Sequence, residues 1–290
     1  MNLLPRWALL GQTIIAAGTF LVAKDATERF TPFQVVWFRI MLSGVLALGV
    51  YALTHSRPRI SRGDWGRLAI LGVMGVSLNQ GFFLYGISMT TPLHASLLYA
   101  FTPVLVLLAS AVWLSEDITL ARGLGIGLSV AGVLVVLAGR GLDLTAGPML
   151  GDLFVLIAVC AWAGYTILGK DVLRRLGTFT VITGAFLFGA LTMLPFAPVA
   201  LRGFDWSSPG LAGWAEIAYL SVITSGVAFT LWYWALKRLD ASQTAVFNNL
   251  QPLFTATLAW AILGDVPGWQ LAAGGVLVLA GVSLAQLPRR

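Results

Sequence analysis

The residues of this chain whose types could bind a solute are uncharged, and they lie beside two prolines. Tyr99 stands four residues before Pro103, and Asn248 stands four residues before Pro252. A proline inside an apolar helix frees the carbonyl four residues earlier. Amide and phenol groups can hydrogen-bond a neutral or zwitterionic solute. The two sites therefore predict paired helix kinks beside a polar centre, with improved helix packing as the alternative role.

Polar and aromatic residues of neighbouring apolar runs can complete this centre. Asn79 and Phe83 are one turn apart and share a helix face. Trp162 lies near the middle of its run, where it can form an aromatic wall with Tyr99 and Phe83. Interhelical hydrogen bonding and aromatic belts are the alternative roles. The expected substrate-binding residues are Tyr99, Asn248, Asn249, Asn79, Phe83, Trp162, Tyr165, Trp232 and Gln251.

Ionisable residues have other expected roles. His94 lies near the end of its run, where packing or hydrogen bonding is the common role and proton coupling the alternative. Arg39 is intramembrane and therefore a candidate for function, but it can reach the interface, so we expect a structural role, with a substrate role as the alternative. Lys24 and Lys170 are expected at a gate or interface, and Glu116 at a helix end. No Asp or Glu falls near the middle of a run, which favours transport without ion coupling.

Composition excludes most other classes of protein. The chain is 58% hydrophobic and 10% charged, whereas soluble domains carry roughly 25% charged residues. Its one cysteine, Cys160, excludes an intrachain disulfide. His55 and His94 are far apart, and nothing resembles a ligand set, so we expect no metal, no cofactor and no enzyme. The net charge of +6 is explained by membrane topology, and no nucleic-acid partner is expected.

Ten apolar runs are long enough to cross a membrane, which takes about 20 residues each. They lie at 6–24, 32–54, 64–90, 92–114, 118–138, 151–170, 178–200, 211–236, 241–263 and 267–287. We expect the first to be a retained helix and not a cleaved signal. With the N-terminus inside, 13 of the 18 Lys and Arg face inward and 4 face outward. The positive-inside rule then places both termini in the cytoplasm, in a multi-pass protein of the cytoplasmic (inner) membrane.

The chain also repeats itself at an offset of 149 residues. LHASLLYAFTPVLVLLASAVWL at 93–114 corresponds to QTAVFNNLQPLFTATLAWAIL at 243–263, and the same offset pairs Gly125 with Gly274 and Gly132 with Gly281. Five spans per copy is an odd number, so the second copy must enter the membrane from the opposite side. We predict an all-α integral membrane protein of ten transmembrane helices, a 5+5 inverted-topology repeat around a central cavity. Residues 1–141 hold spans 1–5, and residues 142–290 hold spans 6–10.

These motifs resemble a known family. The Ala-Ser near a helix start, the mid-helix proline, Leu-Ser-Glu116 and the Gly-rich GLGIGLSVAGVLVV are similar to the EamA repeat of the drug/metabolite transporter superfamily. Within it, the chain resembles the YddG-type exporters of aromatic and other neutral amino acids. The resemblance implies a cavity lined by spans 1, 3, 4, 6, 8 and 9, with spans 5 and 10 peripheral. Related organophosphate carriers have basic residues where this chain has neutral ones, which argues against an anionic substrate.

Together these features predict a transporter that exports neutral amino acids by alternating access. Aromatic or apolar side chains are favoured, and the protein is expected to act as a facilitator and a functional monomer in the lipid bilayer. A drug, nucleoside or other small-metabolite exporter, with or without proton coupling, is the alternative.

Overall fold

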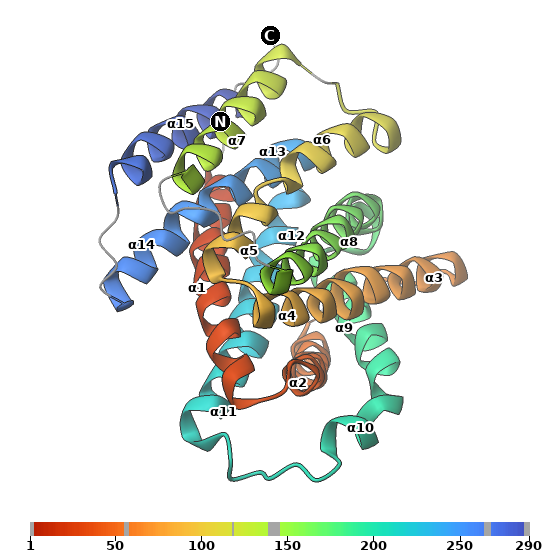
Figure 1. The fold of residues 1–290 in the computed structure, drawn as a ribbon. Coiled ribbons are helices and arrows are strands. Elements are labelled where there is room, and N and C mark those ends of the chain that lie inside the picture. The colour runs from red at the N-terminus through yellow and green to blue at the C-terminus, as the bar shows by residue number, and fades with distance from the viewer. Residues whose placement is uncertain (1–2, 55–57, 118, 139–145, 264–267, 287–290) are drawn as a thin grey trace.

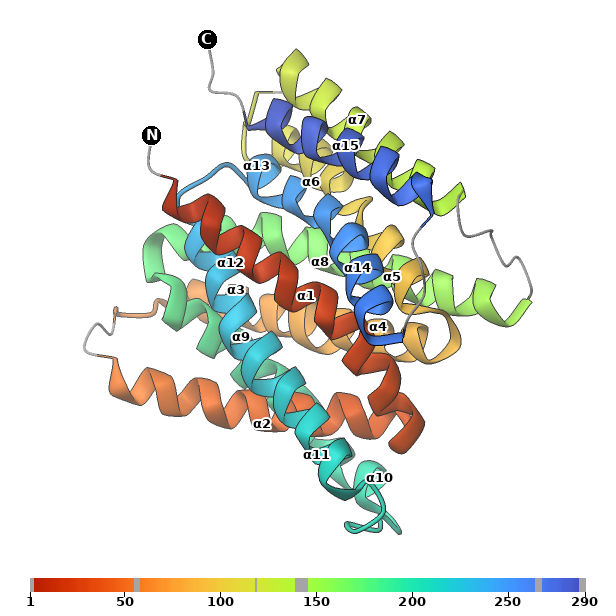
Figure 2. The same ribbon diagram turned by 90° about the vertical axis from the view of Figure 1, so that its left-hand side faces the viewer.

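The computed structural model describes residues 3–54, 58–117, 119–138, 146–263 and 268–286, and all regular structure within these ranges is helical (Figures 1 and 2). The first half contains α1 (Leu4–Arg29), α2 (Pro32–Leu53), α3 (Arg62–Leu71), η1 (Gly72–Leu78), α4 (Asn79–Met89), α5 (Pro92–Tyr99), α6 (Thr102–Trp113) and α7 (Leu120–Ala138). The second contains α8 (Ala146–Leu176), α9 (Thr178–Met193), η2 (Leu194–Phe196), α10 (Ala197–Leu201), α11 (Gly210–Ala218), η3 (Tyr219–Ala228), α12 (Phe229–Leu236), α13 (Ala241–Ala245), η4 (Val246–Leu250), α14 (Gln251–Leu263) and α15 (Trp269–Ala285).

The surface of the helical bundle is apolar, and many polar side chains lie inside it. Val45, Val112 and Val276 are 67%, 74% and 66% exposed, whereas Gln12 and Asn79 are buried. A soluble protein of this size would have the reverse pattern, since large exposed apolar areas mark contact with lipid or a partner. The all-helical membrane fold predicted from the sequence is therefore confirmed.

Seven helices, or unbroken series of helices, in the described ranges are long and apolar enough to cross a membrane. They are Leu4–Arg29, Pro32–Leu53, Arg62–Met89, Pro92–Trp113, Met149–Leu176, Thr178–Leu201 and Gly210–Leu236. Leu120–Val135 and Ala272–Ala285 are shorter apolar helices within the fifth and tenth predicted spans. The ninth predicted span is divided among α13, η4 and α14. The count of ten spans stays a prediction.

Both proline-containing runs are broken just before the proline. Helix α5 ends at Tyr99, and α6 begins at Thr102 with Pro103 in its first turn. In the second half, a 3₁₀ segment over Val246–Leu250 precedes Pro252 in α14. A proline ring fits the first turn of a helix, where its missing N–H has no partner to lose. The chain therefore restarts its helix at each proline.

A second irregularity also recurs in both halves. The π-helical segment η1 spans Gly72–Leu78, and η3 spans Tyr219–Ala228, which overlap when shifted by the repeat offset. Wider π turns rotate the residues that follow and often occur at functional sites. The segments η1 and η3 precede or contain the residues that the third and eighth predicted spans direct to the centre of the molecule.

Helices α7 and α15 pack side by side at one edge of the bundle (Figures 1 and 2). A Cβ on Gly281 would lie 2.5 Å from the carbonyl oxygen of Gly125, and one on Gly132 would lie 2.6 Å from the carbonyl oxygen of Gly274. Gly125 faces Gly281 and Gly132 faces Gly274, so residue numbers rise along α7 where they fall along α15, and the two helices are antiparallel. Because Gly125 corresponds to Gly274 and Gly132 to Gly281 in the repeat, the two contacts exchange under a two-fold rotation, as in a symmetric dimer interface.

The start of α1 lies beside the end of α15. Arg6 donates from Nε to Gln286 Oε1 at 3.1 Å and from its terminal nitrogen to the Gln286 carbonyl at 3.1 Å. Gln286 in turn donates to the Gln243 carbonyl at 2.7 Å. The two ends of the described chain therefore lie on the same side of the bundle. Residues 1–2 and 287–290, the termini themselves, are outside the described residues.

Candidate substrate site

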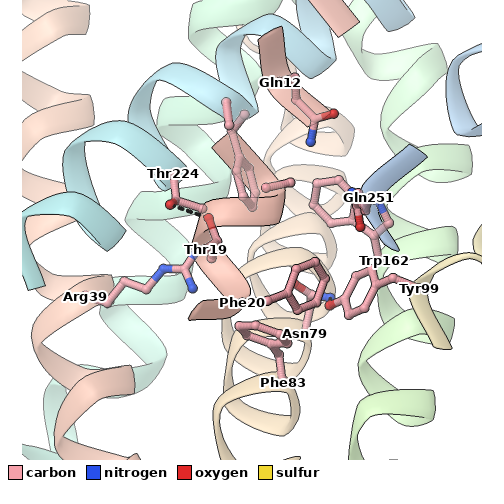
Figure 3. Close-up of a pocket in the computed structure, with 13 residues that line it drawn as sticks. Gln12, Thr19, Phe20, Arg39, Asn79, Phe83, Tyr99, Trp162, Thr224 and Gln251 are labelled. Carbon is pink, nitrogen blue, oxygen red and sulfur yellow. Dashed lines mark hydrogen bonds between the residues drawn. The ribbon is translucent and has the colours of Figure 1, made fainter. Parts of the chain in front are cut away.

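A cavity of about 70 Å³ lies between the helices of both halves (Figure 3). Its walls come from α1, α2, α4, α5, α8, η3, α12 and α14, so α2 joins the spans that the family resemblance implied. None of the described lining residues comes from α7 or α15. The lining residues are Gln12, Ala16, Thr19, Phe20, Arg39, Asn79, Phe83, Tyr99, Trp162, Thr224, Ala228, Phe229 and Gln251.

Five of the thirteen lining residues are aromatic. Phe20, Phe83 and Tyr99 contact one another edge to face, with ring centroids 5.5 to 5.9 Å apart. Trp162 packs edge to face on Phe229 at 5.1 Å. Such edge-to-face pairs are favourable because the positive ring edge meets the negative face. The wall therefore presents apolar and π surface from α1, α4, α5, α8 and α12.

Amide groups supply the neutral polar part of the lining. Asn79 Nδ2 donates to the Tyr99 hydroxyl at 2.9 Å and to the Ala158 carbonyl at 2.8 Å. Gln251 Nε2 donates to Asn248 Oδ1 at 3.1 Å. The side-chain oxygen of Gln251, Oε1, has no hydrogen bond and is buried. A buried acceptor without a partner is costly, so this oxygen is suited to accept a hydrogen bond from a ligand.

The predicted site residues thus separate into two groups. Asn79, Phe83, Tyr99, Trp162 and Gln251 line the cavity, whereas Asn248, Asn249, Tyr165 and Trp232 lie behind it. Pro103 and Pro252 break the helices without lining the cavity.

Each residue behind the lining contacts other protein groups. Asn249 donates to the hydroxyl of Ser129 on α7, so it connects helices. Tyr165 and Trp232 pack against Trp162 at 5.4 and 5.3 Å and support it from behind. Asn248 holds the Gln251 amide from behind. Tyr165, Trp232 and Asn248 thus shape the wall through their neighbours, whereas Asn249 connects η4 to α7.

Arg39 differs from its expected position. It does not reach the interface: its side chain is buried, lines the cavity and donates from Nε to Ser225 Oγ at 3.1 Å. Residues of η3 cover α2 at this point, since Ser43 of α2 also donates to the Ser221 carbonyl at 3.4 Å. Packing against η3 directs the guanidinium inward, toward Thr19 and Phe20 (Figure 3).

His94 lies away from the cavity lining. Its Nδ1 is 3.8 Å from Asp152 Oδ2, and Thr90 donates to the other oxygen of this carboxylate at 2.7 Å. The contacts join the start of α5 to α8. His94 thus faces a carboxylate of α8 and is not among the residues that line the cavity.

A cluster of buried charges joins helices at the end of the bundle that carries Arg6. Lys170 Nζ donates to Glu116 Oε1 at 2.7 Å and to the Leu239 carbonyl at 3.1 Å. Glu116 also accepts from the backbone N–H groups of Ala241 and Ser242 at 2.7 and 3.3 Å, and so caps α13. Burial alone would raise the pKa of Glu116, but Lys170 and these donors outweigh it and hold its pKa below the ordinary value of 4.5.

Other polar contacts join helices at the opposite end. Lys24 Nζ donates to the Ser88 carbonyl at 3.0 Å, joining α1 to α4. Arg29 Nε donates to Glu216 Oε1 at 3.1 Å, joining α1 to α11. Pockets that bind drug-sized ligands measure about 300–1,000 Å³. At about 70 Å³ the cavity is smaller than this range, so we expect it to widen when a solute binds.

Five uncharged polar or aromatic residues of the cavity lining were not predicted from the sequence, namely Gln12, Thr19, Phe20, Thr224 and Phe229. Within the first span, Gln12, Ala16, Thr19 and Phe20 are spaced as one face of a helix, which could have identified that face. For Thr224 and Phe229 the sequence carries no such signal, because the π-helical segment shifts the faces of the eighth span. No group of three or more His, Cys, Asp or Glu among the described residues could hold a metal ion.

A membrane-embedded helical bundle with a polar and aromatic cavity between two related halves is typical of small-molecule transporters. The chain belongs to the EamA-like transporter family, whose model matches residues 6–138 and again 149–286. An uncharacterized transporter of Archaeoglobus fulgidus is 30% identical over 275 residues, 93% of each chain.

Two further similarities concern a named exporter and a solved structure. A protein of Streptantibioticus cattleyicolor named "Probable terminal-alkyne amino-acid exporter" is 28% identical over 281 residues, which cover 96% of this chain and 92% of that protein. A solved crystal structure with 22% identity has a TM-score of 0.76 over 97% of this chain and 96% of its own. The crystal structure shows that the two chains share a fold.

Proposed function

We propose that this EamA-family transporter exports neutral amino acids with aromatic or apolar side chains from the cytoplasm. The observation that carries the proposal is the cavity lining, which combines a cluster of aromatic rings with amide and hydroxyl groups. No Asp or Glu is among the lining residues, so the cavity itself offers no carboxylate for proton or sodium coupling. The similarity to a protein named as an amino-acid exporter supports the same substrate class.

The proposed mechanism is alternating access by two halves of opposite orientation in the cytoplasmic membrane, within a monomer. Two observations support the opposite orientation. The repeat-related helices α7 and α15 run antiparallel through exchanged glycine contacts. The start of α1 and the end of α15 lie on the same side, as an even number of spans requires. In this mechanism the contacts of Lys170 and those of Lys24 open in turn.

Uptake into proteoliposomes tests the proposal. Labelled phenylalanine, methionine and threonine are supplied with and without a proton gradient, and uptake is followed over time. We expect saturable uptake, fastest for phenylalanine and unchanged by the gradient, as for a facilitator. Uptake that requires the gradient would contradict a facilitator. Saturable uptake of nucleosides that also block phenylalanine would favour the wider metabolite exporter.

A further inference from the structure

Arg39 is a buried cation in the cavity wall whose hydrogen bonding is incomplete. Within the described part of the chain, the one hydrogen bond of its side chain runs from Nε to Ser225 Oγ, and no carboxylate lies within ion-pair distance of the guanidinium. Both terminal NH₂ groups therefore have no protein acceptor. The side chain is 3% exposed, and Figure 3 shows it directed into the cavity beside Thr19.

An incompletely paired guanidinium in this position favours an anionic ligand. Burial of a charge without a partner is costly, and a counter-ion that arrives with the ligand offsets that cost. The two NH₂ groups of Arg lie in a plane and match the two oxygens of one carboxylate. Because the lining contains no acidic residue, the ligand has no protein carboxylate to displace.

The rest of the lining defines what the carboxylate is attached to. Phe20 lies beside the guanidinium and begins the aromatic cluster with Phe83 and Tyr99, while Gln251 lies on the far side of that cluster (Figure 3). The cavity thus presents one cationic group, then apolar rings, then an acceptor oxygen.

We propose that Arg39 binds the carboxylate of the transported solute and makes that carboxylate, and not the amino group, the required polar feature. The solute class is a monocarboxylate with one apolar side chain. This assignment rests on the proposed amino-acid transport and names the group that the site recognises. The residues beside the two prolines are neutral, which disfavours a phosphate group bound at those positions. A single carboxylate bound at Arg39, on another helix, is compatible with these neutral residues.

Three compounds with the same phenyl ring test the assignment against purified wild-type protein. Phenylalanine has both charged groups, 3-phenylpropionate lacks the amino group, and phenethylamine lacks the carboxylate. We expect the first two to bind in titrations and to inhibit phenylalanine uptake, and phenethylamine to do neither. This comparison needs no variant, so it stands even if Arg39 variants fold poorly.

Variants then locate the group. Hydrogen bonds to charged groups contribute roughly 1.5–3 kcal/mol, so Arg39→Gln should weaken phenylalanine binding by at least about tenfold. Arg39→Lys should recover part of the affinity, because it keeps the charge. Arg67→Gln is the matched control: it makes the same change at an exposed arginine that is not among the cavity-lining residues, and phenylalanine should bind within about threefold of wild type.

The outcomes separate this assignment from the proposed function. If wild type binds neither carboxylate compound, both fail. If wild type binds and transports phenylalanine but phenethylamine competes as well as 3-phenylpropionate, amino-acid transport stands and the assignment fails. Unchanged phenylalanine affinity in Arg39→Gln would likewise reject the assignment alone.

Discussion

At the scale of single residues, the aromatic cluster sets both the shape and the rigidity of the cavity. Tyr99 takes part in two edge-to-face contacts, and its hydroxyl accepts a hydrogen bond from Asn79. The ring thus holds Phe20 and Phe83 in place, while the hydroxyl fixes the Asn79 amide. A change at this position can remove the ring contacts or the hydrogen bond separately.

Tyr99→Ala should therefore affect both stability and transport. Two ring pairs at about 0.5–1.5 kcal/mol each predict a loss of about 1–3 kcal/mol in the free energy of unfolding, together with a roughly tenfold higher KM for phenylalanine uptake. Tyr99→Phe keeps both ring contacts and should change KM less. Thermal unfolding and uptake measure the two effects. Equal KM values for wild type and Tyr99→Ala would remove Tyr99 from the site.

Glu116 predicts a dependence of stability on pH. Because its pKa is lowered in the folded protein, its carboxylate stabilises the fold above the ordinary value of 4.5, and this stabilisation is lost as pH falls through the lowered pKa. Glu116→Gln removes the nearer of the two carboxylates that face the buried Lys170, the other being Asp240 at 3.9 Å. It should cost up to about 3–5 kcal/mol at neutral pH. It should also flatten the decline in stability below pH 4.5.

A surface ion pair provides the control for Glu116. Arg67 pairs with Asp171 at 3.0 Å, and both side chains are more than half exposed, so Arg67→Gln should cost about 0–1 kcal/mol. The double variant Glu116→Gln with Lys170→Met should cost less than the two single changes added together. Unfolding curves at pH 3.5 to 7.5 measure these differences, and equal losses for Glu116→Gln and Arg67→Gln would disprove the buried pair.

At the scale of helices, close approach of α7 and α15 depends on glycine. Backbone atoms of each helix occupy the space where side chains of the other would be, at Gly125, Gly132 and Gly281. Association of helices in a bilayer depends on such packing, since lipid tails are as apolar as the side chains. The pair also braces the second proline-containing run, because Asn249 of η4 bonds Ser129 of α7.

Gly281→Ala should force these helices apart, because its Cβ would lie 2.5 Å from backbone atoms of Gly125 and Ser129. We expect a loss of about 1–3 kcal/mol in the free energy of unfolding, and a similar loss for its repeat mate, Gly132→Ala. Gly127 lies on α7, as Gly132 does, but an added Cβ at Gly127 would have no atom within 4 Å. Gly127→Ala should be neutral or stabilising by up to about 1 kcal/mol. Equal effects at all three positions would contradict the interface.

At the scale of the whole molecule, different contacts join the helices at the two ends. A buried ion pair of Lys170 and Glu116 lies at the end that carries Arg6, whereas Lys24 and Arg29 make more exposed contacts at the opposite end. The cavity lies between them. The proposed orientation places the buried cluster on the cytoplasmic side.

Labelling of cysteines tests this orientation. In a Cys160→Ser background, we expect Ser207→Cys to react with a membrane-impermeant maleimide in intact cells, and Arg59→Cys to react only after the membrane is permeabilised. Both positions lie between predicted spans on opposite faces of the membrane. Reaction of Arg59→Cys alone in intact cells would reverse the proposed topology. It would also move the cluster of Lys170 and Glu116 from the cytoplasmic side to the outer side.

The sequence by itself determined the helical membrane fold and the breaks at Pro103 and Pro252, because span length, proline and composition act locally. It is the tertiary structure that places Arg39 and Phe229 in the cavity lining and Asn249 against α7. These helices are apolar on nearly every side, since lipid and protein interior are equally apolar. Their hydrophobic pattern therefore does not mark an inward face, and contacts from distant helices decide it.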